Sequence, residues 1–156
     1  DVYKRQWPDG AASASLHEAL QQIVKRCRAA GARVLVNSAH PAAWWREADG
    51  VHLRSADAAR LTARPELPVG ALVGVSAHDN AQVVHARELG ADFAVLGPVL
   101  DTPSHPGAPT LGWEGFVEGN RDAGIPVFAL GGQSTQTVSQ ALRHGAHGIA
   151  GIRGLI

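Results

Sequence analysis

Apolar residues follow two alternating patterns along the chain, one typical of helices and one typical of buried strands. The segment "SLHEALQQIVKRCRAAG" (15–31) has apolar residues at helical spacing from Leu16 to Cys27, and Gly31 is a stop signal for that helix. Short and nearly continuous apolar runs predict strands at 33–37, 50–53, 71–76, 93–97, 127–130 and 148–152. Further helices are predicted through Trp44 and Trp45, from Ser55, and at 79–89, 113–123 and 134–144.

Three related segments, "AGARVLVN", "LGADFAVLG" and "HGAHGIAGI", repeat the transition from one helix to the next strand. Each carries Gly-Ala before a run of small or apolar residues, which indicates a helix stop followed by a buried strand. Continuous apolar runs, rather than strict alternation, predict parallel strands covered on both faces and therefore an α/β fold.

A (β/α) barrel and an open doubly wound sheet both fit this pattern. Strand starts lie about 17 to 22 residues apart, except around one enlarged loop, which favours the barrel, and no G-x-G-x-x-G string is present. A complete barrel needs eight strands, whereas six follow from residue 33 onward. We therefore expect a (β/α)8 TIM barrel that is N-terminally truncated to about six strands, with open edges that bind an upstream segment or a second copy of the chain.

The composition predicts one globular domain, because 156 residues with 45% hydrophobic content can bury a sizeable core. Fourteen basic and fourteen acidic residues cancel, which predicts neither nucleic acid nor an anionic membrane as a partner but leaves small phosphorylated ligands open. Cys27 has no internal disulfide partner, and no signal peptide or apolar run of about 18 residues is present, so we expect a cytoplasmic protein. The absence of methionine, even at position 1, suggests that the sequence begins inside a longer gene product.

Candidate chemistry lies at the carboxyl ends of the predicted strands, where the loops of a parallel barrel converge. The residues there are polar, rich in glycine and nearly free of acids: Asn37, Ser38, Arg54, Asp57, Ser76, His78, the loop 97–113, Gly131, Gly132, Ile152 and Arg153. In "ALGGQS" (129–134), two glycines separate a strand from a polar stretch that opens a helix, so backbone N–H groups there could hold an anion. The alternative is that both glycines only permit a tight turn.

Several segments occur in the order and at the spacing of the thiamine phosphate synthase and TenI family. They are "LVN", "ADGVHL", "LVGVSAH", "GADFAVLGPVLDTPSH", "LGW", "IPVFALGG" and "GAHGIAGIRGL", from about residue 33 to the end. The resemblance implies a thiamine phosphate synthase/TenI-like (β/α) barrel domain at 13–156, after a poorly matching N-terminal remnant at 1–12. It also implies a transferase of thiamine biosynthesis, which joins hydroxymethylpyrimidine diphosphate and thiazole phosphate, with Mg2+, to give thiamine phosphate and pyrophosphate.

The resemblance also implies individual roles. The implied substrate-binding residues are Asn37, Ser76, Thr102, Ser104, His105, Gly131, Gly132, Ile152 and Arg153. Ser76 and His105 are the implied catalytic residues beside the departing pyrophosphate, and Asp57 resembles a Mg2+ ligand. Positioning and electrostatic stabilisation would carry most of such a reaction.

The chain departs from the family pattern at several positions. Ser38 stands where the family has an Asp that helps to bind Mg2+, so the site loses one carboxylate and is expected to be weakened. His105 replaces a Lys that meets the pyrophosphate, and a histidine is mostly neutral near pH 7. Pro98 replaces the acid/base histidine of TenI-type thiazole tautomerases, and "DVYKRQWPDG" does not keep the family's Gln-x-Arg-x-Lys order. Ser38→Asp is expected to strengthen Mg2+-dependent pyrophosphate binding.

Two functions therefore remain open. The first is the transferase, and the second is a non-catalytic or regulatory phosphate-ligand-binding domain fused to an upstream Nudix (8-oxo-dGTP diphosphatase-like) hydrolase. The loop 97–113 resembles the thiamine-synthase-like domain of such bacterial fusions, although no Nudix box lies in this sequence. An upstream segment of the same protein or a homo-oligomer would be the partner.

Simpler structural roles also remain open for single residues. Asp57 could be a helix-start acid, and Ser76 could cap the next helix, although Asp79 is the better cap. His52 is expected to be a hydrogen-bonded strand histidine rather than a metal ligand.

Overall fold

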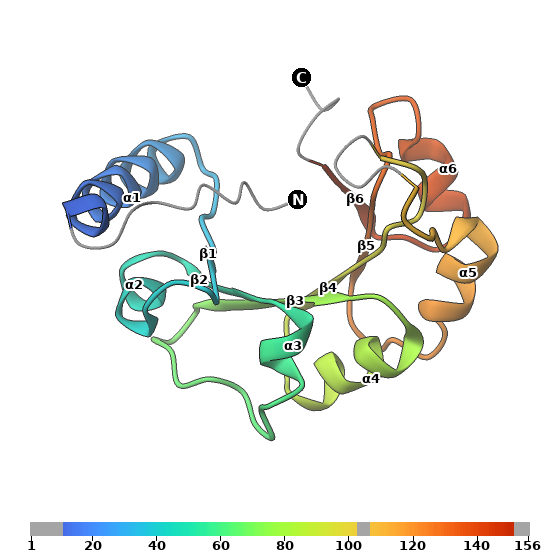
Figure 1. The fold of residues 1–156 in the computed structure, drawn as a ribbon, viewed down its shortest axis with the longest axis horizontal. Coiled ribbons are helices and arrows are strands. Elements are labelled where there is room, and N and C mark those ends of the chain that lie inside the picture. The colour runs from blue at the N-terminus through green and yellow to red at the C-terminus, as the bar shows by residue number, and fades with distance from the viewer. Residues whose placement is uncertain (1–10, 103–106, 152–156) are drawn as a thin grey trace.

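The computed structural model describes residues 11–102 and 107–151 of the chain (Figure 1). All six predicted strands are present: β1 (Val36–Asn37), β2 (Gly50–Leu53), β3 (Leu72–Ala77), β4 (Phe93–Leu96), β5 (Val127–Leu130) and β6 (Gly148–Ala150). The helices are α1 (Ala11–Ala29), α2 (Ala42–Glu47), α3 (Ser55–Ala58), α4 (Asn80–Glu88), α5 (Gly112–Gly119) and α6 (Val138–Arg143). None of the helices in these described ranges is long and apolar enough to span a membrane.

The strands form one parallel sheet in the order β1-β2-β3-β4-β5-β6. Strand order that follows chain order is the arrangement of a (β/α) barrel, whereas a doubly wound sheet reverses its order at a switch point. The helices from α2 to α6, which connect the parallel strands, lie along the outside of the curved sheet (Figure 1). Within the described residues, β1 pairs only with β2 and β6 only with β5, and the six parallel strands with their helices confirm the predicted α/β fold.

The repeated Gly-Ala pairs end three helices in the same way. After α1, Gly31 has a φ of 72° and donates its N–H to Arg28 O, while the next residue donates to Cys27 O. The same pair of hydrogen bonds follows α4 at Gly90 and α6 at Gly145, where φ is 74° and 85°. This arrangement is a Schellman cap, in which a left-handed residue lets the chain satisfy the last helical carbonyls. The predicted helix stops are therefore confirmed.

Two aspartates connect the amino ends of neighbouring strands. Asp49, just before β2, accepts the Val34 N–H at 2.9 Å, and Asp92, just before β4, accepts the Val73 N–H at 2.6 Å. β1 pairs with β2 only through Val36 and Asn37, so it begins at Val36, three residues later than predicted. The first strand of the sheet is therefore shorter than its apolar run.

The hydrophobic core lies between the sheet and the helices that cover its outer face. Its largest fully buried side chains are Phe116, Leu53, Leu96, Val51, Val73, Val75, Val83, Val99 and Val127. The inner face carries the rings of His52, Phe93 and Phe128, with centroids 6.0 Å and 5.7 Å apart in that order. Gly74 makes room for this row, because a Cβ there would lie 2.4 Å from the Phe93 ring. The inner face is thus shaped by aromatic groups beside the polar strand ends.

Candidate functional site

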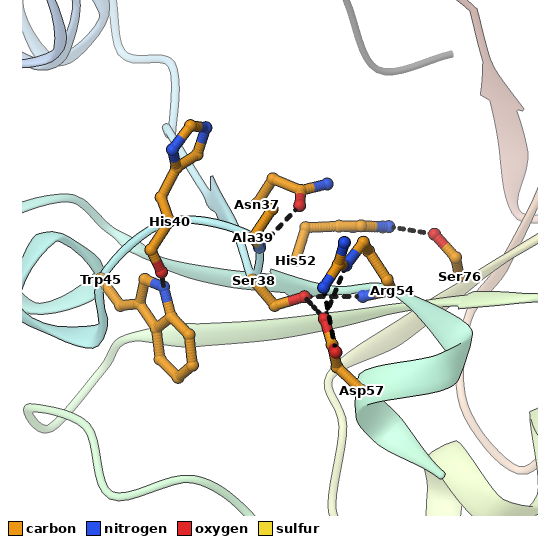
Figure 2. A network of polar contacts seen from close by, with 9 residues as sticks. All are labelled: Asn37, Ser38, Ala39, His40, Trp45, His52, Arg54, Asp57 and Ser76. Carbon is orange, nitrogen blue, oxygen red and sulfur yellow. Dashed lines mark hydrogen bonds and ion pairs between the residues drawn. The ribbon is translucent and has the colours of Figure 1, made fainter. Parts of the chain in front are cut away.

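Polar side chains gather at the carboxyl ends of β1, β2 and β3, which are neighbours in the sheet (Figure 2). Asn37 ends β1, Arg54 follows β2, and Ser76 lies near the end of β3. Parallel strands bring their carboxyl ends to one edge, so residues that are far apart in the sequence become neighbours. The structure therefore brings together the residues predicted on the first three strands.

Asp57, in the short helix α3, is held by Ser38 and Arg54. Its Oδ2 accepts hydrogen bonds from the Ser38 hydroxyl at 2.6 Å and from Arg54 Nε at 2.7 Å, and its Oδ1 accepts from Arg54 Nη2 at 3.1 Å. The Arg54 backbone N–H donates to Ser38 Oγ at 3.0 Å, which closes the network. The hydrogen bonds from Arg54 and then from Ser38 lower the pKa of Asp57, so this group is a carboxylate at neutral pH. The same ion pair raises the pKa of Arg54.

The residues around Asp57 do not fit a magnesium site. Mg2+ prefers several oxygen ligands in octahedral geometry, whereas a guanidinium here contacts both oxygens of Asp57. The neighbouring Ser38 hydroxyl is already a donor to Asp57 and an acceptor for Arg54. Across residues 11–102 and 107–151, no group of three or more His, Cys, Asp or Glu side chains could hold a metal ion. The metal role of Asp57 stays a prediction, and this geometry gives it no support.

Asn37 and Ser76 place polar atoms at the same edge. Asn37 Oδ1 accepts the Ala39 N–H at 2.9 Å, which leaves the Asn37 amide nitrogen without a partner in the described part of the chain. The Ser76 hydroxyl lies 2.8 Å from His52 Nε2. Burial lowers the pKa of His52, so its imidazole is neutral near pH 7 and orients the Ser76 hydroxyl. The expected hydrogen-bonded strand histidine is confirmed, and Asp79 rather than Ser76 caps α4.

Gly131 and Gly132 follow β5, and both have left-handed backbone, with φ of 96° and 63°. A Cβ on Gly131 would lie 2.7 Å from Pro98 Cβ, and a Cβ on Gly132 would lie 2.6 Å from Leu100 Cβ. The Leu100 N–H donates to Gly131 O at 3.2 Å. The chain after β4 therefore passes directly against the two glycines, which explains why side chains are absent there.

The same turn leaves backbone donors unused. The N–H groups of Gly132 and Gln133 donate to no residue in the described ranges. The Gln133 side chain is buried, donates from Nε2 to Gly131 O at 2.7 Å, and accepts from the Thr137 hydroxyl at 2.9 Å. These bonds hold the turn in one conformation. Unused N–H groups in a fixed turn are suited to a phosphate, so the predicted cup is compatible with this geometry.

The remaining predicted residues lie in the enlarged loop and at the chain end. Ser104, His105, Ile152 and Arg153 are outside the described residues, and Thr102 is the last described residue before the gap in the loop. His78 anchors the start of this loop, because its Nδ1 lies 2.7 Å from Gly97 O. No individual role was predicted from the sequence for Arg54, His78 or Gln133. The sequence feature that could have pointed to these residues is their position, directly after a strand or directly after Gly-Gly.

The fold is of the (β/α)-barrel class, with polar side chains at the carboxyl edge of its strands. Residues 5–155 match the family model TMP-TENI, thiamine monophosphate synthase. The chain belongs to this family, which confirms the resemblance seen in the sequence.

Individual relatives agree with this assignment. The putative thiamine-phosphate synthase 2 of Aquifex aeolicus is 37% identical over 121 residues, which cover 78% of this chain and 64% of that protein. The putative thiamine-phosphate synthase of Geobacter sulfurreducens is 40% identical over 128 residues, which cover 81% and 60%. A thiamine phosphate pyrophosphorylase from Pyrococcus furiosus has the same fold, with a TM-score of 0.70 and 22% identity over 93% of this chain and 69% of that chain. The chain thus spans 60% to 64% of the length of the two curated relatives.

Proposed function

We propose that this domain acts in thiamine biosynthesis as a transferase that joins hydroxymethylpyrimidine diphosphate to thiazole phosphate. The products are thiamine phosphate and pyrophosphate. The observation that carries the proposal is the family match over residues 5–155, combined with polar groups at the carboxyl ends of three adjacent strands. The reaction would take place in a cytoplasmic setting, on small phosphorylated substrates.

In this reaction the thiazole nitrogen forms a bond to the methylene carbon of the pyrimidine, and the bond from that carbon to the pyrophosphate oxygen breaks. The side chains of Asn37 and Ser76 would hold the pyrimidine diphosphate, with Ser76 oriented by the neutral His52. The unused N–H groups of Gly132 and Gln133 would hold the thiazole phosphate. Catalysis would then come from positioning and from hydrogen bonds to the departing charge.

Other roles in the proposal rest on the resemblance alone. Thr102, Ser104 and His105 would surround phosphate oxygens, and Ile152 and Arg153 would complete the thiazole phosphate cup. The family is generally Mg2+-dependent. A weakened Mg2+ site at this edge stays a prediction, and no step is assigned to a metal because the groups around the α3 carboxylate do not fit one.

A second candidate function is a non-catalytic domain that binds a phosphorylated ligand. The observation that favours it is the hydrogen-bonded network of Ser38, Arg54 and Asp57. In this network both oxygens of Asp57 accept hydrogen bonds, whereas a Mg2+-dependent transferase would use this carboxylate to bind the metal ion. Fusion to an upstream Nudix hydrolase stays a prediction from the loop sequence.

Product formation separates the two candidates. We expect the chain to form thiamine phosphate from the two phosphorylated substrates, measured by chromatography. Ser76→Ala should lower the rate about tenfold, as expected for a lost hydrogen bond of about 1.4 kcal/mol. Ser139→Ala, at an exposed position of α6, is the matched control and should not change the rate. Binding of thiazole phosphate without product would contradict the transferase and support the second candidate.

A further inference from the structure

Arg54 is placed at the site as a fixed cation. It lies directly after β2, three residues before Asp57, and its guanidinium binds that carboxylate through both Nε and Nη2. The Arg54 side chain is 53% exposed, whereas the Asp57 side chain is 22% exposed. Asp57 therefore contacts one side of the Arg54 guanidinium, and a ligand can still reach the exposed side of the guanidinium.

The guanidinium retains binding capacity after this pairing. An arginine has five N–H donors, of which Asp57 receives two, so three remain without a partner in the described part of the chain. Figure 2 shows Arg54 at the same edge as Asn37 and Ser76. The unused donors of Arg54 and the unused Asn37 amide nitrogen therefore face one region, and the fork geometry of a guanidinium matches phosphate oxygens.

A divalent cation and Arg54 compete for the same two oxygens. Oδ2 of Asp57 already accepts two hydrogen bonds and Oδ1 accepts one, so a metal ion would have one lone pair of Oδ1 left to bind. Binding there would place two cations beside each other. Ser38 adds no second carboxylate to offset that repulsion, and its hydroxyl instead donates to Asp57 and accepts the Arg54 backbone N–H. In this chain the cation beside Asp57 is thus the Arg54 side chain.

We propose that Arg54 takes the place of a divalent metal ion at the carboxyl end of β2 and binds the anionic end of a diphosphate ligand without Mg2+. The inference rests on the proposed function only for the class of ligand. Because Asp57 cancels the charge of Arg54, the affinity comes from directional hydrogen bonds more than from net charge.

The test measures binding of inorganic pyrophosphate by calorimetry, in EDTA and in Mg2+. We expect the 156-residue chain to bind pyrophosphate in EDTA, and Arg54→Ala to bind it about tenfold more weakly. Arg54→Lys keeps the charge but lacks the fork, so it should also bind more weakly, and it decides the matter if the Ala variant does not fold. Arg121→Ala is the matched control, because Arg121 pairs with Glu118 at the same spacing of three residues on a distant exposed helix end. Its affinity should equal that of the unchanged chain.

Several results would overturn the inference. They are pyrophosphate binding that occurs only with Mg2+, no binding in EDTA, or equal affinities for the unchanged chain and both Arg54 variants. Mn2+ titration followed by electron paramagnetic resonance gives an independent readout, and one bound Mn2+ that is lost in Asp57→Asn would also overturn it. Product formation that EDTA abolishes would overturn this inference but leave the transferase intact. Pyrophosphate binding in EDTA without any thiamine phosphate formed would support this inference and contradict the transferase.

Discussion

Gly132→Ala should destabilise the fold clearly more than Gly112→Ala, although both glycines have nearly the same φ. Gly132 has a φ of 63° and Gly112 has a φ of 62°, so each alanine would have to adopt the left-handed region. That conformation costs an alanine about 1 to 2 kcal/mol in either position. The two variants therefore differ only in what the new methyl group meets.

The surroundings of the two positions are opposite. At Gly112 an added Cβ has no heavy atom within 4 Å, whereas at Gly132 it would lie 2.6 Å from Leu100 Cβ and 2.7 Å from Asp101 O. Ordinary contacts begin at 3.4 Å, so the loop after β4 would have to move by about 0.8 Å. Such overpacking typically costs about 1 to 3 kcal/mol, which is the expected difference between the two variants.

Urea unfolding followed by circular dichroism measures this difference directly. With a slope of about 2 kcal/mol per molar, the midpoint of Gly132→Ala should lie about 0.5 to 1.5 M below that of Gly112→Ala. Equal midpoints would refute the close approach of the two segments. If the difference is found, lost phosphate binding in Gly132→Ala would report a displaced loop as well as a blocked cup. The variant alone therefore cannot establish the cup.

Three further predictions concern single polar side chains. The hydrogen bond from the Val34 backbone N–H lowers the pKa of Asp49 in the folded state. The Asp49 carboxylate therefore stabilises the fold above about pH 4, and this stabilisation is lost as the pH falls through the lower folded-state pKa. The urea unfolding midpoints of Asp49→Asn and of the unchanged chain should converge at that low pH. Burial lowers the pKa of His52, so this side chain takes up a proton only in the unfolded chain as the pH falls below about 6.5, and the free energy of unfolding should drop. In urea titrations at several pH values, His52→Gln should remove this part of the pH dependence of stability. Gln133→Leu removes the side-chain donor of the Gly131 carbonyl, which keeps the Leu100 N–H, and should cost about 0.5 to 1.5 kcal/mol in unfolding free energy, with weaker thiazole phosphate binding in calorimetry.

The fold could be predicted from the sequence because its signals are local and repeated. Each Gly-Ala pair both ends a helix and starts the approach to a strand, and Gly31, Gly90 and Gly145 make the same hydrogen bonds in the structure. Continuous apolar runs indicated parallel strands, and the even spacing indicated a barrel. The extent of β1 was not predictable in this way, because its pairing with β2 covers only Val36 and Asn37, and the apolar run does not show where that pairing begins.

The candidate site could be predicted only in part, because positions after strands are visible in a sequence but side-chain pairing is not. Asn37 and Ser76 lie near the carboxyl ends of their strands, and Asp57 lies in α3, which follows β2. The pairing of Arg54 with Asp57 depends on the rotamers of both side chains around the start of α3, and the sequence shows only their spacing. The burial of Gln133 was similarly not visible in the sequence, because it depends on the turn at Gly131, which the Gln133 side chain itself stabilises by its hydrogen bond to the Gly131 carbonyl.

The network at α3 changes what Ser38→Asp should do. The sequence alone predicts that the new carboxylate restores a Mg2+ site, but Arg54 already occupies both oxygens of Asp57 and would bridge to the new carboxylate as well. We therefore expect Ser38→Asp alone to leave Mn2+ affinity unchanged in titrations followed by electron paramagnetic resonance. Ser38→Asp combined with Arg54→Gly removes the competing cation and leaves two carboxylates together, so this double variant should bind Mn2+ at least tenfold more tightly, or about 1.4 kcal/mol. Tight Mn2+ binding by Ser38→Asp alone would show that Arg54 leaves the carboxylate readily and does not act as the cation of this site.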